Sequence, residues 1–168
     1  ESSGVELKRD DVVPERLAKE MAALLNLEGG HILLGVEKDR TVSGLTRDPE
    51  RAEEWVMECA RTHVRPAIIP FWETMDYGDR RIVGVVSLPS DAPDKPYKAK
   101  RGSAWVTQVR VGTTSRDATD EEEVASDGRF TIATADGDLV AACQKSGAAG
   151  FSEAEFMQMV DLAFEKRK

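Results

Sequence analysis

Apolar residues recur at helical spacing in two segments of the first half of the chain. In residues 14–27 they fall on one side of a predicted amphipathic helix, and Gly29 and Gly30 end it. A second helix is predicted over 48–64, with Asp48 as its N-cap. Each helix should pack its apolar side against a core.

Shorter apolar and β-branched runs predict strands. The first strand covers 5–8. Residues 31–36 are almost continuously apolar, which is typical of a strand buried on both faces. Three more strands are predicted at 67–75, 81–88 and 104–111, and the first two of these form a hairpin across the turn at Tyr77-Gly78-Asp79.

The last third of the chain carries a separate set of signals. They predict a short helix at 119–124, a hairpin of strands 129–135 and 138–143, and a final helix opened by a capping box at Ser152. The order of elements favours an α+β fold, with a mixed, largely antiparallel sheet and packed helices. We expect one domain over 1–126 and an appended hairpin and helix over 127–168.

Length and composition narrow the class of protein. The chain has 168 residues, enough for one domain with a hydrophobic core. No apolar run approaches the ~20 residues of a membrane helix, and a signal peptide is not evident, so we expect a cytoplasmic protein with no membrane partner. The two cysteines, Cys59 and Cys143, should be reduced and packed as small hydrophobes. With two histidines besides, the sequence supports neither a zinc site nor a Cys–His nucleophile pair.

The net charge of −8 counts against a simple nucleic-acid binder, because phosphate contacts need Lys and Arg. A local basic patch can still dominate within a Debye length of ~8–10 Å, so the position of the positive charge decides. Lys98 and Lys100 share one face if their segment is extended, and the guanidinium of Arg110 suits bidentate phosphate contact. The candidate phosphate ligands, which have Tyr97 and Trp105 among them, are Lys98, Lys100, Arg101, Arg110 and Arg116. A solvated loop is the open alternative.

A second candidate site lies at the start of the chain. Glu6 and Lys8 are two residues apart on a predicted strand and therefore project to the same face. A carboxylate that holds Mg²⁺ or Mn²⁺ beside a lysine near the phosphate is the arrangement of a metal-dependent nuclease. Glu1 could supply a second oxygen ligand. A surface salt bridge between Glu6 and Lys8 is the open alternative.

Together and in this order, the motifs resemble the Schlafen AlbA-type domain family over roughly residues 1–124. The matching elements are Glu1-Ser2, Glu6-Leu7-Lys8, Asn26 to Gly30, Gly35-Val36-Glu37, Gly44-Leu45, Arg65-Pro66, Val85 to Pro89, Pro96-Tyr97 and Arg110-Val111-Gly112. The resemblance implies the fold of that family. It also implies a link to nucleic acid, since many prokaryotic members are regarded as DNA-binding domains and animal relatives include nucleases of structured RNA.

The resemblance further implies three carboxylate metal ligands in a nuclease. Two of these positions are Glu1 and Glu6, and Lys38 stands at the third. An ammonium group there inverts the local charge and should expel a divalent cation, although Glu37 or Asp39 could substitute. This departure leaves catalysis in doubt.

Three functions follow as hypotheses. The leading one is a nucleic-acid-binding domain, for RNA or DNA, that contacts phosphates through the five basic residues and Lys8. The second is a metal-dependent endoribonuclease for structured RNA such as tRNA, with Glu1, Glu6 and Lys8 as catalytic residues and Mg²⁺ or Mn²⁺ held by Glu1, Glu6 and Asp39. The third is a protein-interaction or assembly module, in which 127–168 could form a homo-oligomer contact.

Overall fold

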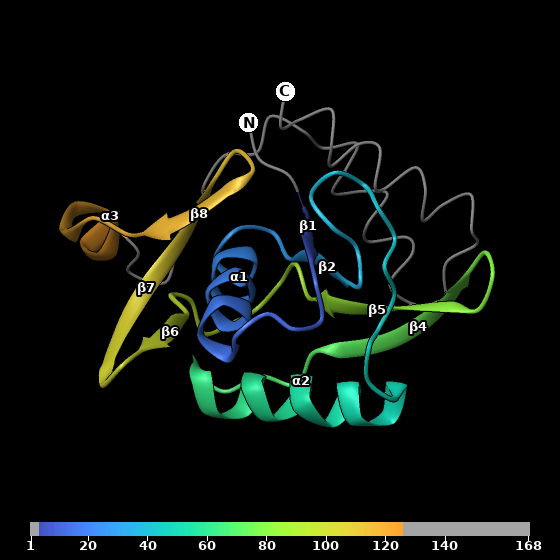
Figure 1. The fold of residues 1–168 in the computed structure, drawn as a ribbon. Helices are drawn as coiled ribbons and strands as arrows, with labels where there is room; N and C mark the ends of the chain where they lie inside the picture. Colours follow the sequence, from blue (N-terminus) through green and yellow to red (C-terminus); the bar gives the residue numbers. More distant parts are fainter. Residues whose placement is uncertain (1–3, 126–168) are drawn as a thin grey trace.

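The computed structural model describes residues 4–125 and places helix α1 (Pro14–Asn26) between two four-stranded sheets (Figure 1). The first sheet has the order β1-β2-β5-β4. Its strands are β1 (Val5–Lys8), β2 (Gly30–Leu34), β5 (Arg81–Leu88) and β4 (Phe71–Tyr77). Strands β1 and β2 are parallel, and the other pairs are antiparallel.

The second sheet is antiparallel throughout and has the order β3-β6-β7-β8. Its strands are β3 (Val64–Arg65), β6 (Lys98–Arg101), β7 (Ala104–Val111) and β8 (Thr114–Asp117). Helix α2 (Pro49–His63) leads directly into β3, and α3 (Asp120–Ala125) follows β8. In Figure 1 this sheet lies to the left of α1, and the first sheet lies to its right.

Helix α1 is the centre of the core. Leu17, Met21 and Leu24 are fully buried, and the small side chains Ala18 and Ala22 between them let neighbouring elements approach closely. The helix contacts both sheets and α2. Because so much of its surface is covered, tertiary packing rather than helix propensity stabilises it.

Strand β1 pairs with β2 only because β2 begins with glycine. Gly30 has φ of +146°, and a Cβ there would collide with the backbone oxygen of Gly4. The same oxygen accepts a hydrogen bond from the N–H of His31 at 2.7 Å. Gly30 therefore allows the close parallel pairing that holds Glu6 and Lys8 against the rest of the protein.

Most predicted elements within the described residues are confirmed, and so is the α+β class with mainly antiparallel pairing. Asp48 caps α2 by accepting the N–H of Glu50 at 3.0 Å, and β2 is buried along its whole length. The predicted strand at 67–75 was wrong in its start, since β4 begins at Phe71, after Pro70. Strands β3, β6 and β8 were not predicted, and the strands form two sheets.

Other predictions lie partly or wholly beyond the described residues. The hairpin of 129–143 and the final helix are in that part of the chain, as is Cys143, and the division at 126 stays a prediction. Cys59 is a free, buried cysteine, and burial raises the pKa of its thiol to about 12. No helix among residues 4–125 is long and apolar enough to cross a membrane.

Candidate nucleic-acid interface and the ionic network behind it

The register of the second sheet separates its side chains into two faces. Val64 pairs with Ala99, and both are buried in the core that α1 helps to form. Their strand neighbours, Arg65 and Lys98, also pair and therefore lie on the opposite face. We call this opposite side, which is turned away from α1, the outer face.

The pairing of β6 with β7 and of β7 with β8 extends the outer face across the sheet. Lys98 pairs with Thr107, Lys100 with Trp105, Val109 with Arg116, and Val111 with Thr114. With Arg65, the outer positions are therefore Arg65, Lys98, Lys100, Trp105, Thr107, Val109, Val111, Thr114 and Arg116. Four of these nine residues are Lys or Arg, and none is Asp or Glu. Thr107 and Val109 are buried, so the accessible cations lie toward the two edges.

One edge carries a compact group of three cations and an aromatic ring. We call Arg65, Lys98, Lys100 and Trp105 the basic patch. The guanidinium of Arg65 lies 4.0 Å from the centroid of the Trp105 ring, a contact that independently places both residues on the same side of the sheet. Arg65 is exposed, and the other three side chains are partly exposed.

Arg116, at the other edge, is held by a carboxylate. Its guanidinium lies 2.8 Å from Glu122 in the first turn of α3. The hydrogen bonds from Arg116 lower the pKa of Glu122 to about 2, so this pair stays ionised at neutral pH. The charge of Arg116 is therefore partly neutralised within the protein.

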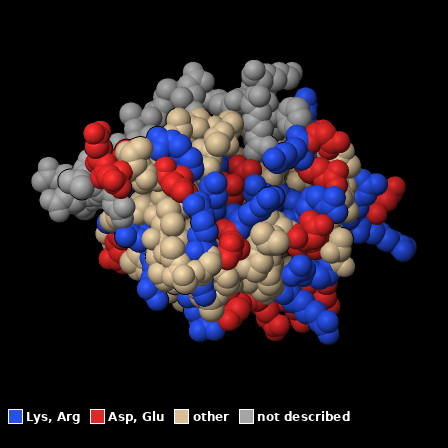
Figure 2. Space-filling model, turned by 60° about the vertical axis from the view of Figure 1, so that its left-hand side comes forward, with Lys and Arg blue, Asp and Glu red and all other residues tan. Residues whose placement is uncertain are grey.

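Arg101 lies on the α1 side of the second sheet. It makes two hydrogen bonds to Asp117, at 2.7 and 2.5 Å, and these hold the pKa of Asp117 below its usual value. A groove of about 250 Å³ runs here between α1 and β6, and we call it the α1–β6 groove. It is lined by Val13, Glu15, Arg16, Lys19, Ala99, Lys100, Arg101 and Gln108. Figure 2 shows Lys and Arg side chains gathered across the middle of the face that it presents, with Asp and Glu among them.

Arg110 has an internal position that does not suit phosphate contact. Its side chain is 0% exposed, because it projects from β7 toward α1 and β1. The guanidinium donates to Glu6 at 2.9 Å, to Glu20 at 3.1 Å and to the hydroxyl of Ser115 at 3.1 Å. The guanidinium of Arg110 is therefore not accessible to a phosphate.

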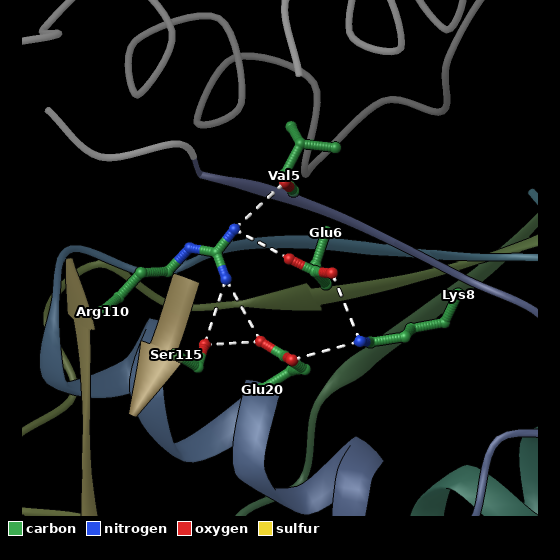
Figure 3. A network of polar contacts seen from close by, with 6 residues as sticks. All are labelled: Val5, Glu6, Lys8, Glu20, Arg110 and Ser115. Atoms are coloured by element: carbon green, nitrogen blue, oxygen red, sulfur yellow. Dashed lines mark hydrogen bonds and ion pairs between the residues drawn. The ribbon is translucent and has the colours of Figure 1, made fainter. Parts of the chain in front are cut away.

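Lys8 completes a closed ring of alternating charges, as Figure 3 shows. Its ammonium lies 3.3 Å from Glu6 and 3.2 Å from Glu20, and each of these carboxylates also contacts Arg110. Glu6 and Lys8 do share a face, as the spacing predicted. The ring is largely buried, and its two positive and two negative charges cancel.

This network does not fit a divalent cation. Each of the four carboxylate oxygens of Glu6 and Glu20 faces Lys8 or Arg110, and Ser115 donates a further hydrogen bond to Glu20. No group of three or more His, Cys, Asp or Glu side chains within residues 4–125 is arranged to hold a metal ion. Glu1 lies outside the described residues, so a metal site that includes it stays a prediction.

Asp39, the third metal ligand that we expected, lies in the loop that follows β2. Its carboxylate is exposed and accepts the N–H of Thr41 at 2.9 Å, which lowers the pKa of Asp39. Asp39 and Lys38 line a hollow of about 720 Å³, which Lys8 also borders. Glu6 does not line this hollow, and its carboxylate contacts the buried Arg110.

Sequence reasoning missed Glu20 and Arg65. Glu20 had one available signal, because it lies between Leu17 and Met21 on the buried side of α1 and therefore needs a partner. No signal in the sequence indicated Arg65, because only the pairing of β3 with β6 brings it beside Lys98.

Comparisons with known proteins agree with this architecture. The family model described as Schlafen, AlbA_2 matches residues 1–119. A second model, described as 3' exoribonuclease family, domain 2, matches residues 116–166, less than a third of the chain and mostly beyond the described residues. No curated protein matches the chain.

Two solved structures are similar in fold. The N-terminal domain of a RecG-related protein from Nitrosomonas europaea has a TM-score of 0.52 and 22% identity, over 71% of this chain and 85% of that one. The DIP2311 protein from Corynebacterium diphtheriae has a TM-score of 0.55 and 17% identity, over 78% of this chain. The alignment covers 25% of DIP2311. At these identities the similarity concerns the fold alone.

Proposed function

This chain belongs to the Schlafen, AlbA_2 family, and on that premise we propose that it is a nucleic-acid-binding domain that holds phosphates at the basic patch. The observation that carries the proposal is the register of the second sheet. It brings Arg65, Lys98 and Lys100 together on a face whose strand positions include no acidic residue. In a chain with a net charge of −8, this is a local reversal of sign.

The surroundings of the patch support this choice over other surfaces. Helix α2 presents four exposed acidic residues, Glu50, Glu53, Glu54 and Glu58, against two exposed arginines. A phosphate backbone is repelled there and attracted to the second sheet. Lys100 and Arg101 also line the α1–β6 groove, so a bound strand can pass from the outer face to the groove around the turn between β6 and β7. Contacts of this kind give affinity with little sequence specificity.

The name of one protein of similar fold is consistent with the proposal. One neighbour in fold is related by name to the ATP-dependent DNA helicase RecG, a protein class that acts on nucleic acid. We do not extend the proposal to nuclease activity, because the carboxylates of Glu6 and Glu20 are occupied by Lys8 and Arg110.

Charge reversal at the patch tests the proposal. The variant Lys98→Glu/Lys100→Glu should weaken binding of a labelled oligonucleotide at low salt by about tenfold or more, because it removes two phosphate contacts and adds repulsion. Fluorescence anisotropy measures the affinity.

The matched control is Arg51→Glu/Arg61→Glu on the exposed side of α2, which changes the net charge equally. It should bind almost as the unaltered protein does. Equal losses in the two variants would mean that only the overall charge matters. If neither RNA nor DNA binds the unaltered protein at low salt, the proposed function is wrong.

A further inference from the structure

We propose that the Arg65–Trp105 pair is a stacking site for an unpaired base, so that the basic patch prefers single-stranded nucleic acid to duplex. This inference rests on the proposed function and adds a substrate class to it. It depends on one contact, the guanidinium of Arg65 at 4.0 Å from the centroid of the Trp105 ring. The two lysines of β6 lie beside this pair.

The stack is held by the sheet. Trp105 projects outward from β7, directly opposite Lys100 on β6. Arg65 belongs to the two-residue strand β3, which α2 precedes and which pairs with β6. Among residues 4–125, no carboxylate forms an ion pair with Arg65, whereas Arg101 and Arg116 each have one. The guanidinium of Arg65 thus keeps its charge available for a ligand.

The planar guanidinium of Arg65 can serve as a second layer on the indole ring of Trp105, so that a base stacks on the guanidinium. The central carbon of the guanidinium lies over the Trp105 ring, and Arg65 is exposed, so a ligand can reach the guanidinium. Bases of single strands stack on aromatic rings and on guanidinium planes, and they do so with little regard to base identity because every base has a π-face. Positive charge beside the stack attracts the phosphates that flank such a base.

The lysines have the spacing to hold those phosphates. Lys98 and Lys100 are two residues apart on one face of a strand, so their Cα atoms are about 6.5 Å apart along β6. This separation is close to that of successive phosphates in an extended strand. Two phosphates on the lysines would leave the base of one nucleotide beside the Arg65–Trp105 pair.

Duplex nucleic acid cannot use this site in the same way. Its bases are already paired and stacked inside the helix, and it would have to pay the energy of unstacking before a base could reach Trp105. Duplex therefore retains the phosphate contacts and loses the stacking contact. The expected discrimination against duplex is about tenfold, within the range that removal of one base–aromatic stack produces.

An abasic oligonucleotide separates stacking from phosphate binding. We would compare oligothymidine with an abasic strand of the same length and phosphate count, by fluorescence anisotropy at one low salt concentration. The unaltered protein should bind oligothymidine about tenfold more tightly than the abasic strand. Trp105→Leu should lower the affinity for oligothymidine to the abasic level and leave the abasic affinity unchanged.

A conservative variant shows whether Trp105→Leu acts through the lost aromatic ring or through a folding defect. Trp105→Phe keeps an aromatic face and should restore most of the preference for oligothymidine. Equal, salt-sensitive binding of both strands by the unaltered protein would overturn the stacking site and leave the proposed function in place. Absence of binding to either strand would overturn both, and this comparison needs no variant.

Discussion

At the scale of single residues, the unusual feature is a set of charges buried at the centre of the molecule. Arg110 is fully buried, and Glu6 and Glu20 are each less than a tenth exposed. Isolated charges in such a place would be very unfavourable, and they are tolerated because each one faces two groups of opposite sign. The ring fixes where β1, α1 and β7 lie relative to one another.

Removing Arg110 should therefore cost more than removing any exposed arginine. Arg110→Met keeps much of the side-chain volume but removes one of the two ring cations that face the buried carboxylates of Glu6 and Glu20. We expect the free energy of unfolding to fall by about 3–5 kcal/mol, as measured by urea denaturation.

Arg116→Met is the control for this prediction, because it makes the same charge change at an exposed ion pair. It should lower the free energy of unfolding by about 0–1 kcal/mol. Similar effects of the two substitutions would show that the buried ring does not hold the three elements together.

At the scale of elements, the C-terminal end of α1 is tied to the second sheet by one side chain. Asn26 is fully buried. Its amide donates to the backbone oxygens of Tyr97, at 2.9 Å, and Gln108, at 2.6 Å, and its Oδ1 accepts the N–H of Tyr97 at 2.6 Å. The three bonds fix the residue that leads into β6 and a residue in the middle of β7, so they position the strands that carry the basic patch.

Asn26→Ala should reduce the free energy of unfolding by about 2–4 kcal/mol, because it leaves buried backbone groups without partners. Hydrogen exchange at the Tyr97 amide should become faster. Asn26→Asp keeps the acceptor for the Tyr97 N–H but places a carboxylate against two carbonyl oxygens, so it should be at least as destabilising. If Asn26→Asp is as stable as the unaltered protein, the donated bonds do not contribute.

The elements also show how far the sequence can predict this fold. Helices α1 and α2 were predicted within about two residues because their signals, apolar periodicity and caps, are local. Strands β6 and β8 carry little apolar pattern, since Ala99 is the one apolar residue of β6 and β8 has none. Such strands are defined by their neighbours across the sheet, and this information is absent from a short stretch of sequence.

The candidate site, like the fold, could be predicted from the sequence only in part. The shared face of Glu6 and Lys8 followed from the two-residue period of a strand. The burial of Arg110 did not, because its partners Glu6 and Glu20 are 104 and 90 residues away in the chain. The pairing of Arg65 with Trp105 likewise depends on strand register.

At the scale of the whole molecule, several Lys and Arg side chains of this acidic chain are neutralised by its own carboxylates. Arg110 and Lys8 are held by Glu6 and Glu20, Arg101 by Asp117, and Arg116 by Glu122. The cations of the basic patch lie on strands whose outer positions lack an acidic residue. The number of phosphates that the domain neutralises should therefore be smaller than its count of lysines and arginines suggests.

The salt dependence of binding measures that number. Each phosphate neutralised on a single strand contributes about −0.7 to the slope of log affinity against log salt, so contacts by Arg65, Lys98 and Lys100 predict a slope of about −2. All five residues named from the sequence, acting together, would give about −3.5. Lys100→Gln should make the slope shallower by about 0.7, whereas Arg116→Gln, which alters a cation already held by Glu122, should leave it nearly unchanged. A steep slope that Lys100→Gln does not alter would place the phosphates away from both the basic patch and the α1–β6 groove, because Lys100 borders both.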